Sequence, residues 1–148
     1  MPRVEFYVLP DADDRARLKL ACRLTERAYL AGQRVFIALE DTAQLRALDD
    51  MLWTFGERSF VPHEQFRDDQ QWQQTPVLLS CAEQPQQSFD LMLNLGITVP
   101  GAAALATQIA EIIDADETRR RAGRTRFRHY RDQGSMPKTH NLTADQTP

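Results

Sequence analysis

The sequence predicts an α/β protein whose mostly parallel sheet carries helices on both faces. Short apolar runs alternate along the chain with segments in which apolar residues recur at helical spacing. The run at residues 35–39 is hydrophobic without a break, as in a parallel strand that is buried on both faces. The chain has 148 residues, of which 42% are hydrophobic, and these values suit one domain with a sizeable core.

The first strand is predicted at residues 4–9, where β-branched and aromatic residues precede Pro10. A helix should follow, because acidic residues of the kind that cap helix N-termini come directly after the proline. We expect it to reach about Ala31, since Gly32 suits the left-handed position that ends a helix. Its inward stripe is predicted to comprise Leu18, Ala21, Cys22, Thr25 and Tyr29.

The second strand, residues 35–39, leads into a helix that begins near Thr42 and repeats leucine at helical spacing. Residues 64–75 are mostly polar, and we expect a surface loop there although it contains Phe66 and Trp72. Two further strands are predicted after this loop, at residues 77–81 and 90–95.

Residues 108–114 leave two alternatives open, because they could extend a helix from the preceding alanines or form a fifth strand. The last helix is expected between Asp116 and about Asp132. The fold class predicted is therefore α/β, a three-layer, Rossmann-like fold with a mostly parallel five-stranded sheet. It should occupy residues 1–134 as a single domain, and residues 135–148 should form a loose, polar C-terminal tail.

The charge of the chain is distributed unevenly. Residues 1–114 carry 10 basic and 17 acidic side chains, whereas residues 115–148 carry 8 basic and 4 acidic ones. This asymmetry indicates that the C-terminal part meets an acidic partner. No apolar run approaches the roughly 18 residues of a membrane span, and the N-terminus lacks the apolar core of a signal peptide, so a cytoplasmic location is expected.

The residues that a nucleotide, a metal or a catalytic site requires are missing. The loop at residues 10–14 has three acids and no glycine, so it should repel phosphate, and we expect no cofactor. The turn at residues 40–41 is interpreted as a helix cap and not as a ribose-binding acid. His63, His129 and His140 lack metal-ligand spacing, no nucleophile stands beside a base, and Cys22 and Cys81 are interpreted as buried free thiols.

Two segments favour surface roles. In the last helix one stripe is shared by Arg120, Arg124, Phe127 and Arg131. It is either a solvated basic face, a pocket for an acidic peptide with a hydrophobic end, or a site for single-stranded nucleic acid. The second segment contains Trp53 and residues 60–63. Trp53 lies off the leucine stripe of its helix, which indicates either a small satellite cluster or a protein interface.

Several motifs together resemble one family. They are VEFYVL at the start, LDDMLWTFGERSFVPH at residues 48–63, the later DLMLNL, and RFRHYRDQG at the end of the last helix. On these motifs the chain resembles the chi subunit family of bacterial DNA polymerase III over about residues 3–140. The resemblance implies a Rossmann-like fold without catalytic activity, placed in the clamp-loader assembly through the psi subunit, and a strand at residues 108–113.

The resemblance also implies two binding sites. The first would hold the acidic C-terminal tail of single-stranded DNA-binding protein, which ends in phenylalanine, and it maps onto Arg120, Arg124, Phe127 and Thr139. Phe127 stands where a tyrosine is familiar in the family, so a hydroxyl contact is lost. The second would contact psi or the clamp loader through Trp53, Phe60, Val61 and Pro62. The residues alone leave a nucleotide-dependent enzyme or a direct single-stranded DNA binder as alternatives.

Overall fold

The computed structural model describes residues 2–56 and 60–148. Within them the chain forms one sheet of seven parallel strands, three α-helices and three short 3-10 helices. In chain order the elements are β1 (Arg3–Val8), α1 (Asp14–Leu30), β2 (Val35–Ala38), α2 (Thr42–Thr54), β3 (His63–Gln65), η1 (Asp69–Gln73), β4 (Val77–Ser80), β5 (Phe89–Asn94), η2 (Gly101–Leu105), β6 (Ala106–Ile113), α3 (Glu117–Asp132), β7 (Lys138–Asn141) and η3 (Ala144–Gln146).

The strands lie in the order β3-β4-β2-β5-β6-β1-β7, so the sheet has two more strands than the sequence predicted. The five predicted strands are all present and form its centre. The additional strands, β3 and β7, pair at the two edges with β4 and β1. The open alternative at residues 108–114 is resolved as a strand, because β6 pairs with both β1 and β5.

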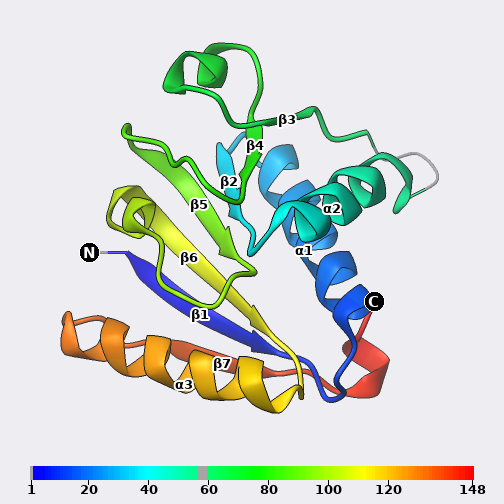
Figure 1. The fold of residues 1–148 in the computed structure, drawn as a ribbon, viewed down its shortest axis with the longest axis vertical. Coiled ribbons are helices and arrows are strands. Elements are labelled where there is room, and N and C mark those ends of the chain that lie inside the picture. The colour runs from blue at the N-terminus through cyan, green and yellow to red at the C-terminus, as the bar shows by residue number, and fades with distance from the viewer. Residues whose placement is uncertain (1, 57–59) are drawn as a thin grey trace.

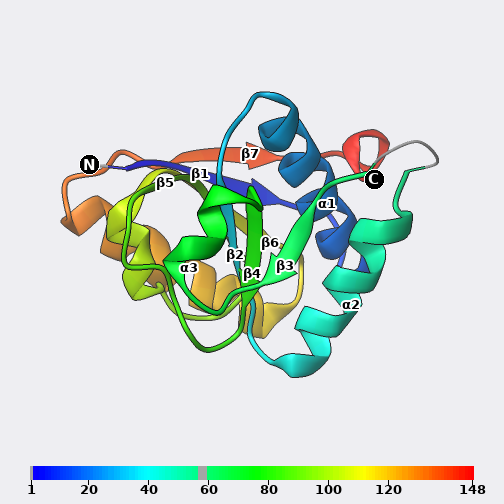
Figure 2. The same ribbon diagram turned by 90° about the horizontal axis from the view of Figure 1, so that it is seen from above.

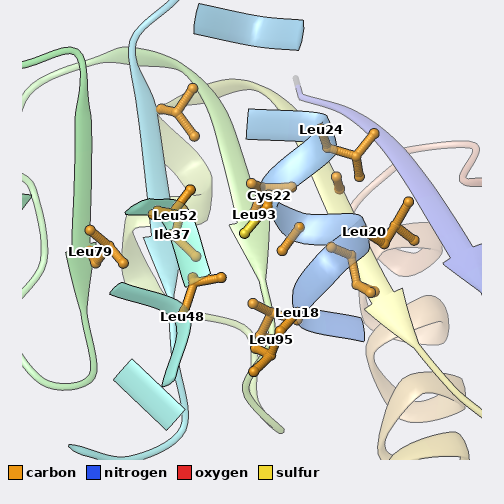
Figure 3. Packing of buried hydrophobic residues seen from close by; sticks show 14 of the residues in the cluster. Leu18, Leu20, Cys22, Leu24, Ile37, Leu48, Leu52, Leu79, Leu93 and Leu95 are labelled. Carbon is orange, nitrogen blue, oxygen red and sulfur yellow. The ribbon is translucent and has the colours of Figure 1, made fainter. Parts of the chain in front are cut away.

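Helices α1 and α2 cover one face of the sheet and α3 covers the other (Figures 1 and 2). The larger hydrophobic cluster lies under α1 and α2, where leucines of the two helices meet alternate residues of the central strands (Figure 3). The intervening strand residues, such as Phe36 and Met92, point to the α3 face. Each central strand therefore buries both of its faces, as its unbroken hydrophobicity predicted.

The face that carries α3 also uses the segment predicted as a surface loop. Trp72 in η1 stacks on Phe89, with ring centroids 5.8 Å apart, and Phe66 meets Phe36 edge to face at 6.1 Å. Both aromatics are buried, so the surface-loop prediction is wrong for them. Their burial has a physical reason, because α3 alone leaves the β2–β4 part of this face uncovered and η1 closes it.

Local signals set the helix ends as predicted. The carboxylate of Asp13 accepts a hydrogen bond from the N–H of Ala16 at 3.1 Å at the start of α1, and Asp41 accepts one from Gln44 at 2.8 Å at the start of α2. The turn at residues 40–41 is thus a helix cap. Gly32 has φ of +78°, the left-handed conformation that ends α1.

Cys22 is buried, and burial raises the pKa of its thiol to about 12, whereas Cys81 is partly exposed and the prediction of burial is wrong for it. Residues 138–141 pair with β1, which contradicts the expected looseness of this segment. Among the described residues, no helix is long and apolar enough to span a membrane.

Candidate functional site

The seven arginines of α3 differ in whether they have an acidic partner. Arg126 and Arg119 reach buried carboxylates under the helix, at 2.9 Å and 2.6 Å. Arg121 pairs with Glu117 along the surface of the helix at 2.7 Å. Arg131 lies 4.0 Å from its neighbour Asp132. Among the residues that the structure describes, no acidic partner lies within ion-pair distance of Arg120, Arg124 or Arg128.

The buried pair anchors the middle of α3 to the sheet. Glu111 of β6 is fully buried and accepts hydrogen bonds from Arg126 Nε at 2.9 Å, Tyr130 OH at 2.6 Å and Asn94 Nδ2 at 3.0 Å. Burial and the Glu111 charge both raise the pKa of Tyr130, so its hydroxyl remains a donor. A fully bonded network of this kind fixes the position of α3 on the sheet.

A second pair anchors the start of α3. The guanidinium of Arg119 donates two hydrogen bonds to Asp114, Nε to Oδ1 at 2.8 Å and Nη2 to Oδ2 at 2.6 Å. Burial by itself would raise the pKa of Asp114, but hydrogen bonds from Arg119 and from the Asp116 backbone outweigh it, and the pKa lies below its usual value. Asp116 caps the helix by accepting from the N–H of Arg119 at 3.0 Å.

Two arginines of the predicted stripe, Arg120 and Arg124, line a groove between α3 and the edge of the sheet, whereas the third, Arg131, is not among its lining residues. The groove has a volume of about 330 Å³. Its apolar wall comes from β1, β6 and α3, and its far side comes from β7, the edge strand that pairs with β1. The lining residues are Phe6, Val8, Ile113, Arg120, Gly123, Arg124, Phe127, Thr139 and Asn141.

The register of β7 on β1 orders the groove along its length. Asn141 lies opposite Val8, and Thr139 lies opposite Phe6. Because side chains two residues apart on a strand share a face, Thr139 and Asn141 both lie on the groove side of β7. The ring of Phe127 packs on Phe6 with centroids 5.3 Å apart. The groove therefore has an aromatic end, with arginines along the helix side and neutral polar groups along the strand side.

Gly123 allows α3 to approach the sheet closely enough to form this groove. A Cβ added at residue 123 would collide with Cδ1 of Ile113, which belongs to β6. The close approach explains a glycine in the middle of a helix, where it otherwise costs about 1 kcal/mol relative to alanine.

The structure places all four residues predicted for the first site, Arg120, Arg124, Phe127 and Thr139, around this one groove. Asn141 also lines the groove and was not predicted from the sequence. The signal that would have found it is the pairing of β7 with β1, since residues two apart on a strand share a face.

The predicted second surface is brought together only in part. Trp53 and Phe60 are 53% and 60% exposed, and their rings lie 5.5 Å apart, with the His63 ring 4.7 Å from Trp53. Pro62 is partly exposed, whereas Val61 is buried in the core at 1% exposure and presents no side chain to the surface. Ser59, which belongs to the sequence motif, lies outside the described residues.

The buried His63 ring supports this aromatic pair. Its Nδ1 lies 2.7 Å from the carbonyl oxygen of Val61. Its Nε2 lies 3.1 Å from Asp49 Oδ1, which is close enough for an ion pair but lacks hydrogen-bond geometry. The imidazole thus fixes the chain after residue 60 against α2 and leaves the two aromatic rings at the surface.

Comparison with known proteins identifies the family. The family model described as DNA polymerase III chi subunit, HolC, matches residues 1–138 of this chain. The chain belongs to the DNA polymerase III chi subunit family. Relatives named DNA polymerase III subunit chi agree with this assignment. The chain is 39% identical to that of Pseudomonas aeruginosa over 142 residues, covering 96% of this chain and 98% of the relative.

More distant chi relatives also align along nearly their whole length. The subunit of Haemophilus influenzae is 29% identical over 139 residues, with 93% of this chain and 96% of the relative covered. That of Escherichia coli is 26% identical over 139 residues, with 90% and 94% covered.

Similar solved structures include the C-terminal domain of the DEAD-box protein Dbp5. Its TM-score is 0.58 at 9% identity, covering 93% of this chain and 90% of that domain. S. cerevisiae Dbp5 bound to Nup159, Gle1, IP6 and ADP gives 0.62 at 10% identity, covering 98% of this chain and 44% of the other. At these identities the likeness concerns the fold alone.

In this chi-family chain, an internal carboxylate occupies the place that suits a phosphate. Phosphates in nucleotide-binding sheets lie at the N-terminus of the helix after the first strand. Here the N–H of Asp13 at that position donates to Asp114 at 2.9 Å, and Arg17 Nη2 donates to the carbonyl oxygen of Leu95 at 3.0 Å. In the ranges 2–56 and 60–148, no three His, Cys, Asp or Glu side chains are grouped so that they could hold a metal ion.

Proposed function

We propose that this chain is a non-catalytic accessory subunit of the DNA polymerase III clamp-loader assembly. It tethers the assembly to single-stranded DNA-binding protein by holding that protein's acidic C-terminal tail in the groove beside α3. Family membership supports the polymerase context. The observation that carries the tail-binding role is that Arg120 and Arg124 lie beside the wall of Phe6 and Phe127 and have no acidic partner in the part of the chain that the structure describes.

The groove offers each chemical feature that such a tail requires. Unpaired guanidinium groups attract an acidic segment over a distance and then bind a carboxylate with charge-assisted hydrogen bonds. The apolar wall of Phe6, Val8 and Phe127 offers a surface on which a terminal phenylalanine ring buries its area. Charge brings the tail to the helix, and ring burial then slows its release.

Calorimetry with synthetic tail peptides tests this proposal. We expect a peptide of acidic residues ending in phenylalanine to bind, with an affinity that falls as salt is added because exposed charges are screened. A peptide that lacks the terminal phenylalanine should bind much more weakly, since it loses the buried ring and displaces the carboxylate. Equal binding of the two peptides would contradict the groove as the site.

Substitution of one groove arginine identifies the site on the protein. Arg124→Ala should weaken tail binding by about 1–3 kcal/mol, the typical cost of losing a charged hydrogen bond. Arg121→Ala is the matched control, because it removes the same charge from the same helix outside the groove. Equal losses in the two variants would indicate general attraction to a basic helix.

We further propose that Trp53, Phe60 and Pro62 contact the psi subunit or another clamp-loader subunit. Two neighbouring exposed aromatics support this role, since aromatic side chains anchor protein interfaces. Trp53→Ala should abolish co-purification with the partner subunit and leave tail-peptide binding unchanged. Direct binding of bare single-stranded DNA in a gel shift, unaffected by Arg124→Ala, would favour a nucleic-acid role over the tail-binding one.

A further inference from the structure

The strand side of the groove carries polar groups that the fold leaves unused. Thr139 and Asn141 are exposed and line the groove from β7, while their backbones pair with β1. Among the described residues, neither side chain has a hydrogen-bond partner. Their neighbour His140 faces the opposite way, where its ring stacks on Tyr7 at 4.9 Å. The two unused groups therefore lie on the groove side of an anchored strand.

The two sides of the groove differ in what they can bind. Arginine only donates hydrogen bonds, so Arg120 and Arg124 suit the carboxylates of a bound chain. A bound chain also presents main-chain N–H groups, which arginine cannot satisfy. The amide of Asn141 both donates and accepts, and it can therefore meet the N–H and the C=O of one peptide residue.

We propose that Asn141, with Thr139 beside it, binds the main chain of the captured tail, while Arg120 and Arg124 bind its carboxylates. This assigns Asn141 as a specificity-determining residue of the site, and it rests on the proposed function. The peptide lies along the groove between α3 and β7, with its backbone turned toward the strand. A main-chain amide of the peptide that is buried without a hydrogen-bond partner would weaken binding. Asn141 offers that partner to an extended main chain and therefore makes the site selective for it.

A cycle of two peptides and two variants tests the division. The peptides are the acidic tail ending in a free phenylalanine carboxylate and the same tail ending in an amide. Wild type should prefer the free acid, and Arg124→Ala should reduce that preference. Leucine has nearly the same shape as asparagine. The variant Asn141→Leu should therefore bind both peptides more weakly by the same factor, roughly five- to tenfold for the loss of a neutral hydrogen-bonding group.

His140→Ala is the matched control on the same strand. It removes the stacking on Tyr7 and the contact with Glu5 at 3.4 Å, so it reports any loss that comes only from a loosened β7. We expect it to bind both peptides within about twofold of wild type. Thermal melts of all variants establish that each one is folded before its affinity is compared.

Three results would overturn the assignment of Asn141. Unchanged binding by Asn141→Leu would show that Asn141 does not contact the peptide. A loss of affinity confined to the free-acid peptide would show that Asn141 contacts the terminal carboxylate and not the main chain. An equal loss in His140→Ala would attribute the effect to β7 itself. If wild type binds neither peptide, the proposed function itself is wrong. In the other three cases wild type still binds the tail, and only the assignment of Asn141 is wrong.

Discussion

Helix α3 carries two groups of arginines, one that points to the sheet and one that lines the groove, and the two groups serve different purposes. Arg119 and Arg126 each meet a buried carboxylate through hydrogen bonds, and they hold the helix on the sheet. Arg120 and Arg124 lie one or two residues away in sequence, yet the other described residues that line their groove are apolar or neutral. All four residues carry the same positive charge, so charge alone does not distinguish an anchor from a binding group. The distinction depends on whether the fold places an acidic partner beside the arginine.

The largest effect should come from removing the buried anchor. Arg126→Met leaves Glu111 charged in the core with only neutral donors, so the free energy of unfolding should fall by about 3–5 kcal/mol. Urea denaturation measures this. The double variant Arg126→Met with Glu111→Gln should be more stable than the single one, because no unpaired charge remains. A double variant no more stable than the single one would show that lost packing, not charge, causes the effect.

A smaller effect with a distinct pH dependence is expected at the second anchor. Asp114→Asn should lower the free energy of unfolding at pH 7 by about 1–3 kcal/mol, because Arg119 loses a charged acceptor. The pKa of Asp114 is depressed in the fold, so its contribution is complete above the unfolded value of about 3.9 and is lost as pH falls through the native value.

Denaturation at several pH values checks this sign. The stability gap between wild type and Asp114→Asn should be constant at neutral pH and should narrow in strong acid, where the wild-type carboxyl is also neutral. A gap that stays the same through the acid range would assign the effect to side-chain geometry and not to charge.

The smallest stability effect is expected in the groove itself. The double variant Arg120→Ala with Arg124→Ala should have a free energy of unfolding within about 0.5 kcal/mol of the wild-type value, because neither arginine has an acidic partner among the described residues. Its tail binding should nevertheless be lost. Thermal melts combined with calorimetry measure both quantities on the same protein. A destabilised double variant would place these arginines among the anchors and remove the contrast.

Much of the fold could be predicted because its signals are local. Asp13 and Gly32 mark the ends of α1, and the unbroken apolar run at residues 35–39 marks a buried strand. The edge strands lack such signals. All four residues of strand β7 are polar and classed as exposed. The place of β7 in the sheet comes from backbone pairing with β1, which no side-chain pattern records. Trp72 was misplaced for a similar reason, since an isolated aromatic does not reveal which distant face it covers.

The candidate site was predictable on one side only. Helical spacing places Arg120, Arg124 and Phe127 on one stripe, so the helix side of the groove follows from the sequence. Thr139 came from the family resemblance, and Asn141 was not found, because the strand side depends on the register between residues 138–141 and β1. Helical spacing also could not separate Arg120 from the anchoring Arg119 and Arg126, because their partners Asp114 and Glu111 lie outside α3.

The pairing of β1 with β7 also sets when the groove can exist during synthesis. Val8 and Asn141 face each other across that pair, although almost the whole chain separates them in sequence. Contacts of such long separation close late, because the loop entropy must be overcome before they form. A ribosome-bound chain can therefore assemble α1, α2 and the central strands while the strand wall of the groove is still unmade. The site that captures a partner is completed last, after the scaffold that supports it.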